Sequence, residues 1–165
     1  MTDDEATALL NLGDSLAEYW APMDTLAKYL DLGLAKEVKE SSKSPSAMPQ
    51  WKIIAKELSG LKKKAKPFAK ETQKLGLSWL KAGNSKSGEI KTYQKPARDY
   101  FKKFAKMKAS FDAIKRLVDE MEAELGMEVQ GKFQMNKYLK YRRSVVTAEK
   151  RLSKTYVKFL TVRGV

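Results

Sequence analysis

Apolar residues recur along this chain at intervals of three, four and seven, which is the spacing of one face of an α-helix. The clearest row lies between residues 91 and 126, where two interleaved sets repeat every seven residues over about four heptads. The first set is Ala97, Phe104, Phe111, Val118 and Leu125, and the second is Tyr100, Met107, Ile114 and Met121. This pattern predicts a long helix over 91–126 with these side chains on a buried seam.

Two further rows predict helices over 50–82 and 132–161. Tyr138, Val145, Leu152 and Phe159 repeat by sevens in the second of these ranges. The apolar face of the first consists of Trp51, Ile54, Leu58, Leu61, Ala65, Phe68, Leu75 and Trp79. Pro49 suits the first position of that helix, and Pro67 is expected to kink it. Tyr100, Phe104 and Tyr138 fall on the seams, so we expect them in the core, together with the three tryptophans.

The first 37 residues predict an acidic helical region over 3–37. Thr2 or Asp3 is the expected N-cap, because acidic side chains fill the first turn and face the positive end of the helix. Pro22 interrupts the apolar spacing, so we expect two shorter helices that meet at Ala21–Pro22. The serine- and proline-rich stretch 41–49 is expected to be a linker, and GNSKSGE at 83–89 a loop.

No alternating pattern predicts a β-strand. We therefore expect one all-α domain over residues 1–165, an elongated antiparallel bundle of about four long helices. Short loops join the last three helices, so neighbouring helices should run in opposite directions.

Composition excludes much enzyme chemistry, because the chain contains neither cysteine nor histidine. Thiol nucleophiles, thiolate metal sites and imidazole bases are therefore unavailable. Glu120 and Glu124 share a helix face, with Glu128 beyond them, but the chain lacks the histidines of a bundle metal site, so we interpret these carboxylates as a solvated face. The loop at 83–89 lacks the spacing of a phosphate-binding loop. We predict a non-enzymatic protein with no cofactor and no metal.

Apolar runs of about 18 residues, the length that spans a membrane, are absent from the sequence. The first five residues are acidic, whereas a signal peptide begins with basic residues. These observations predict an intracellular or virion protein that is not secreted by a signal peptide.

The net charge of +13 biases the choice of partner toward nucleic acid, anionic lipid or an acidic protein surface. The charge is distributed in blocks along the chain. Residues 1–35 carry a net −6, residues 36–115 carry +14, residues 116–131 carry −4 and residues 132–165 carry +9.

Basic residues form an outward row on each of the last three predicted helices. In an antiparallel bundle the tracts 62–81, 91–106 and 142–158 meet at one end, and the acidic tract 119–128 lies at the other. The predicted nucleic-acid-binding residues are Lys62, Lys63, Lys64, Lys66, Lys70, Lys74, Lys91, Lys95, Arg98, Lys102, Lys103, Lys106, Lys140, Arg142, Arg143, Lys150, Arg151, Lys154 and Lys158. Tyr93, Phe101 and Tyr141 lie off the strict seams and are candidates for stacking on bases.

The sequence therefore predicts a largely sequence-independent nucleic-acid-binding protein of architectural or packaging type, such as a nucleocapsid or virion coat subunit. DNA and RNA are both open. The alternative is a helical interaction or self-assembly subunit, a homo-oligomer in which the acidic first helix of one copy meets the basic surface of another. A third hypothesis, binding to an anionic membrane surface, is weaker because the most apolar segment is acidic.

Overall fold

A computed structural model of the protein describes residues 1–162, which form five α-helices and one short 3-10 helix. In chain order the elements are α1 (Asp3–Leu30), α2 (Leu34–Ser41), α3 (Gln50–Ser85), α4 (Ile90–Leu125), η1 (Lys132–Gln134) and α5 (Met135–Thr161). This part of the chain contains no strand. The all-α class is therefore confirmed, although the number and bounds of the helices differ from the prediction.

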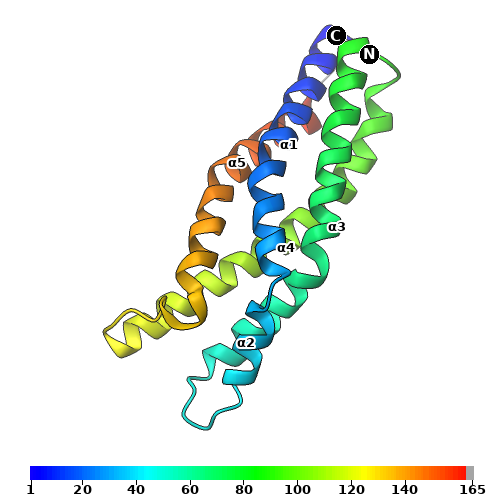
Figure 1. The fold of residues 1–165 in the computed structure, drawn as a ribbon. Coiled ribbons are helices and arrows are strands. Elements are labelled where there is room, and N and C mark those ends of the chain that lie inside the picture. Colours follow the sequence, from blue (N-terminus) through cyan, green and yellow to red (C-terminus); the bar gives the residue numbers. More distant parts are fainter. Residues whose placement is uncertain (163–165) are drawn as a thin grey trace.

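The helices form an elongated bundle in which α1 packs against both α3 and α5 (Figure 1). Helix α1 runs antiparallel to these two neighbours, and α4 crosses the bundle obliquely and extends away from it at its C-terminal end. The loop between α2 and α3 lies at the opposite end of the molecule from the N-terminus. One core of buried apolar side chains draws on all five α-helices.

Helix α1 begins with a capping box, as the residues at its start predict. The Thr2 hydroxyl accepts a hydrogen bond from the backbone N–H of Glu5 at 3.1 Å, and the Glu5 carboxylate accepts one from the Thr2 N–H at 2.8 Å. Two of the backbone N–H groups that a helix start leaves unpaired are thereby satisfied. Thr2, not Asp3, is the N-cap.

The predicted break at Pro22 is not found, because α1 continues through this residue to Leu30. The chain leaves the helix at residues 31–33 instead. Helix α2 follows and overlaps the last residues of the helical region expected over 3–37 and the first residue of the linker expected over 41–49. A single buried row crosses Pro22 at spacings of three and four: Leu9, Leu12, Leu16, Tyr19, Met23, Leu26 and Leu30. Packing of this row compensates for the hydrogen bond that Pro22 cannot make.

Small residues allow α1 and α3 to approach closely. A Cβ atom added to Gly13 of α1 would lie 3.0 Å from the backbone nitrogen of Leu80 and 3.2 Å from the carbonyl oxygen of Gly76 on α3. One added to Gly83 would lie 3.2 Å from the carbonyl oxygen of Ala6. Larger side chains at these positions would force the two backbones apart.

Helix α3 passes through both Gly60 and Pro67 without interruption and ends at Ser85, beyond the predicted end at 82. Lys86 adopts the left-handed conformation that terminates the helix. Helix α5 starts at Met135, because the preceding residues 132–134 form the separate turn η1.

The heptad seam predicted for α4 is buried at every position except the last. Leu125, the last residue of α4, is 47% exposed. The α5 row is buried, and Tyr100, Phe104 and Tyr138 lie in the core as predicted. Trp51 and Trp79 are buried as well. Trp20 is only half-buried, and the neighbouring Tyr19 occupies the core position that was expected for Trp20.

Candidate functional site

Exposed basic side chains cover parts of α3, α4 and α5. Of the nineteen predicted residues, fifteen are exposed and form no ion pair with the described residues. We call these fifteen the basic surface: Lys62, Lys63, Lys64, Lys70, Lys74, Lys91, Lys95, Arg98, Lys102, Lys106, Lys140, Arg143, Lys150, Lys154 and Lys158.

Three of the other four residues are paired with carboxylates at the surface. The Lys66 ammonium donates to Asp31 at 2.6 Å, and this hydrogen bond holds the pKa of Asp31 below its ordinary value. The Lys103 ammonium lies 3.0 Å from the Glu71 carboxylate. Arg151 is bracketed by two carboxylates of α1, those of Asp14 and Glu18. Carboxylates from the first helical region therefore neutralise part of the predicted surface.

Arg142, the fourth residue, is buried and does not belong to the surface. Its guanidinium forms two hydrogen bonds with the Glu149 carboxylate, at 2.7 and 2.9 Å, inside the bundle. The spacing of α5 contains the signal for this burial. A second row, Met135, Arg142, Glu149 and Tyr156, interleaves with the predicted apolar row and completes its spacing of three and four.

A continuous basic row runs along α4. Its five members, separated by four, three, four and four residues, are Lys91, Lys95, Arg98, Lys102 and Lys106. Residues at this spacing lie on one side of a helix, here over about 22 Å at a rise of 1.5 Å per residue. Asp99 is the only carboxylate between residues 91 and 106. Like charges four residues apart destabilise a helix, so this row favours a bound anion.

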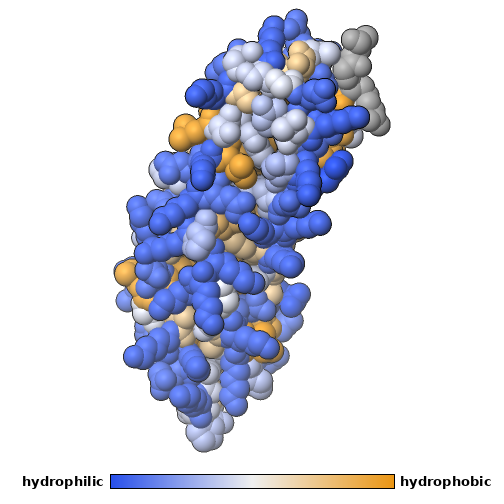
Figure 2. All heavy atoms as spheres, turned by 90° about the vertical axis from the view of Figure 1, so that its right-hand side faces the viewer, coloured by the Kyte–Doolittle hydropathy of each residue, from blue (hydrophilic) through white to orange (hydrophobic). Residues whose placement is uncertain are grey.

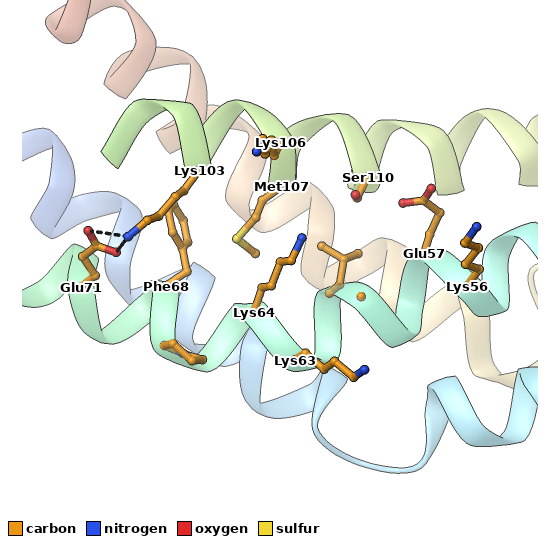
Figure 3. Close-up of a pocket in the computed structure, with 13 residues that line it drawn as sticks. Lys56, Glu57, Lys63, Lys64, Phe68, Glu71, Lys103, Lys106, Met107 and Ser110 are labelled. Carbon is orange, nitrogen blue, oxygen red and sulfur yellow. Dashed lines mark hydrogen bonds and ion pairs between the residues drawn. The ribbon is translucent and has the colours of Figure 1, made fainter. Parts of the chain in front are cut away.

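A groove separates the basic residues of α3 from those of α4. It has a volume of about 650 Å³, and the stretch from Lys56 to Glu71 forms one wall while residues 103–110 form the other. Figure 3 shows Lys64 extending from α3 toward α4 across this space, whereas Lys63 points away from it. Leu61, Phe68 and Met107 supply the apolar lining.

Charge around the groove is predominantly positive. Five lysines line it, but only two carboxylates do, and one of these, Glu71, is already paired with Lys103 (Figure 3). The prediction from sequence missed Lys56, Gly60, Met107 and Ser110 as neighbours in one groove. The antiparallel alignment of the two helices, in which the rings of Phe68 and Tyr100 stack, brings these residues together, and no spacing along the sequence signals it.

The predicted gathering of basic tracts at one end is accompanied by acidic residues. The C-terminal end of α3 and the N-terminal end of α4 do lie together, and the acidic tract 119–128 lies far from them (Figure 1). The N-terminus of α1 lies at the same end, and its Asp3 pairs with Lys86. Hydrophilic side chains dominate the face drawn in Figure 2, with only separate apolar patches. This end of the molecule therefore carries charges of both signs.

The three aromatic candidates for base stacking all have partners within the protein. Phe101 is buried and stacks on Tyr156 with a centroid separation of 3.7 Å. Tyr141 packs against Tyr29 at 4.9 Å, and the Tyr93 hydroxyl donates to the carbonyl of Ser87 at 3.0 Å. These contacts favour binding through basic side chains over binding through exposed rings.

Within residues 1–162 no group of three or more carboxylates is placed to hold a metal ion. The same range contains no helix whose length and apolar character suffice to cross a membrane. No protein-family model, curated protein or solved structure matches the chain.

Proposed function

We propose that this protein is a non-enzymatic nucleic-acid-binding protein that contacts phosphates through the basic surface, in an architectural or packaging role. The observation that carries the proposal is the set of fifteen exposed basic residues on α3, α4 and α5 that form no ion pair within residues 1–162. Some surface lysines elsewhere pair with nearby carboxylates, as in Lys28–Asp24 and Lys108–Asp112. Other exposed basic residues, such as Lys52 and Lys81 on α3, form no ion pair with the described residues either. What distinguishes the basic surface is its concentration of unpaired cations on α3, α4 and α5, including the continuous row along α4.

The dimensions of the α4 row suit a polyanion. Duplex DNA carries one negative charge per about 1.7 Å of its axis, so a row of about 22 Å faces on the order of a dozen phosphate charges. Five cations along this length are enough to release several counterions. Contacts of lysine and arginine with phosphates carry no sequence information, so binding through this row is largely independent of sequence.

Self-association through the acidic first helix is less well supported. Asp14 and Glu18 are paired with Arg151 of the same chain, and Asp24 is paired with Lys28. These carboxylates are therefore not free to meet the basic surface of another copy.

The proposal is tested by fluorescence anisotropy with labelled DNA duplexes and RNA single strands of unrelated sequence. The logarithm of the affinity should fall linearly with the logarithm of salt concentration, with a slope of about −0.9 per phosphate contacted on duplex DNA. The double variant Lys95→Gln/Lys102→Gln should reduce the magnitude of this slope by up to about 2. Loss of affinity should be the same for every sequence tested.

The matched control is Lys28→Gln/Lys43→Gln, which changes the net charge equally but removes lysines that pair locally with Asp24 and Glu40. Its slope should equal that of the wild type. Absence of binding at about 50 mM salt, where the Debye length exceeds 10 Å, would overturn the proposal. Equal slopes for the two double variants would overturn the assignment of the α4 row.

A further inference from the structure

The far end of α4 is an acidic tip that exposes apolar side chains. Leu125 and Met127, separated only by Gly126, are 47% and 65% exposed. Glu120 and Glu128 lie on either side of them and form no ion pair with the described residues. We call residues 120–128 the acidic tip, which projects from the bundle in Figure 1.

Hydrogen bonds hold the tip in one shape. Gly126 adopts a left-handed conformation with φ of 65° and ends α4. The Glu122 carboxylate then accepts hydrogen bonds from the backbone N–H of Val129 at 3.1 Å and from the Gln130 amide at 3.3 Å. Exposure of the two apolar side chains is therefore a property of an ordered turn.

The groove between α3 and α4 has the complementary properties. Its lining is apolar at Leu61 and Met107, and its lysines outnumber its carboxylates. Lys64 and Lys106 belong to the basic surface and have no ion pair among the described residues. A volume of about 650 Å³ lies within the range of protein pockets that enclose small organic ligands, and it accommodates two apolar side chains.

The tip cannot reach the groove of its own chain. Met107 in the groove and Leu125 in the tip belong to the same unbroken helix, eighteen residues apart. At 1.5 Å per residue the helix holds them about 27 Å from each other. Only the tip of another molecule can enter the groove.

We propose that the acidic tip of one copy of this protein docks into the groove of a second copy. Leu125 and Met127 enter the apolar lining, and the carboxylates of Glu120 and Glu128 meet Lys64 and Lys106. The two surfaces are different, so the contact is heterologous and leaves a free tip and a free groove at the ends of any assembly that does not close into a ring. The product is an open chain or a ring of copies, and its formation requires no nucleic acid.

The contact is small, so the association is expected to be weak and concentration-dependent. It is tested by sedimentation velocity of nuclease-treated protein between about 10 and 500 µM, a range that detects micromolar to millimolar affinities. At about 50 mM salt the sedimentation coefficient should rise with concentration, and at about 500 mM salt the rise should shrink because the ion pairs are screened.

Two variants remove the contact without changing any charge. Leu125→Ser/Met127→Ser alters the tip, and Gly60→Trp fills the groove, where an added Cβ meets no atom within 4 Å. Each variant alone should remain monomeric at every concentration. An equimolar mixture should form dimers and nothing larger, because one variant retains its groove and the other its tip.

Matched controls place the same changes elsewhere. Leu77→Ser removes an apolar side chain that is 64% exposed on α3, and Ser78→Trp adds an indole at an exposed position of that helix. Both should associate like the wild type. A wild-type protein that stays monomeric at about 500 µM, or a mixture that forms no dimers, would overturn the proposal. All the variants keep every lysine, so their affinity for nucleic acid tests the proposed function separately.

Discussion

Arg142 and Glu149, seven residues apart on α5, form a two-point ion pair inside the bundle. The side chains are only 6% and 4% exposed. Burial by itself lowers the pKa of Arg142, but the hydrogen bonds and charge of the Glu149 carboxylate outweigh it and raise the pKa above the ordinary value. The guanidinium also lies 4.7 Å from the centre of the Phe111 ring and 3.3 Å from a carboxylate oxygen of Asp112, both on α4. The pair therefore ties α5 to α4.

We predict that Glu149→Gln destabilises the protein by about 3–5 kcal/mol, because it leaves the Arg142 charge buried with little compensation. The double variant Arg142→Met/Glu149→Leu should recover most of this loss, since no buried charge remains. Urea unfolding followed by circular dichroism measures both effects. Arg151→Gln, which removes an exposed pair, is the control and should cost no more than about 1 kcal/mol. A Glu149→Gln protein as stable as this control would contradict the account.

The buried face of a helix could be predicted from the sequence wherever apolar residues alone occupied it. The α4 seam is the clearest case, because its aromatic and aliphatic residues recur without a gap through Met121. In α5 the same spacing includes Arg142 and Glu149, and the charge of Arg142 led to its prediction as a surface residue. These two side chains are buried because they pair with each other. The helical spacing is compatible with this pairing, but charged residue types alone do not predict burial.

The continuity of α1 through Pro22 and the groove between α3 and α4 could not be predicted from local sequence patterns, for different reasons. Pro22 lowers the stability of a helix locally, but its effect is decided by how well Tyr19 and Met23 pack against other helices. The groove depends on the relative shift of α3 and α4, which brings Lys64 and Lys106 to opposite walls of one space. No run of residues along the chain encodes that shift by itself.

Two buried tyrosines should respond in opposite ways to loss of their hydroxyl groups. The Tyr100 hydroxyl lies 2.8 Å from the Thr72 hydroxyl, so Tyr100→Phe should cost about 1 kcal/mol. The Tyr138 hydroxyl is buried without a hydrogen-bond partner among the described residues, so Tyr138→Phe should be neutral or stabilising. Chemical denaturation of the two variants checks the difference, and equal destabilisation by both would contradict it.

Replacing glycine by alanine should have opposite effects on stability at Gly13 of α1 and at Gly60 of α3. Gly13→Ala should destabilise the protein by about 1–3 kcal/mol, because the new Cβ overpacks against the backbone of α3. Gly60→Ala should stabilise it by about 0.5–1 kcal/mol, because alanine favours the helix and the added Cβ meets open space. Thermal unfolding measures both changes. A stabilising Gly13→Ala substitution would show that α1 and α3 are not in close contact at this point.

The last prediction concerns the acid sensitivity of the contact between α4 and α5. Partial burial raises the pKa of Asp112, but hydrogen bonds and charges from Lys108 and Arg142 outweigh it, so the pKa lies below its ordinary value. A carboxylate with a lowered pKa in the folded state stabilises the protein above the unfolded pKa of about 3.9, and this contribution is lost as the pH falls through the folded value.

The free energy of unfolding of the wild type should therefore exceed that of Asp112→Asn at neutral pH, and the difference should narrow as the pH falls below about 4. Urea titrations of both proteins at a series of pH values measure this difference directly. The contribution is modest, because the Asp112 side chain is 55% exposed and water screens its charge. A difference that stays constant from neutral to acidic pH would show that Asp112 gains nothing from its two basic neighbours. Arg142 would then hold α5 against α4 through its contact with the Phe111 ring and not through Asp112.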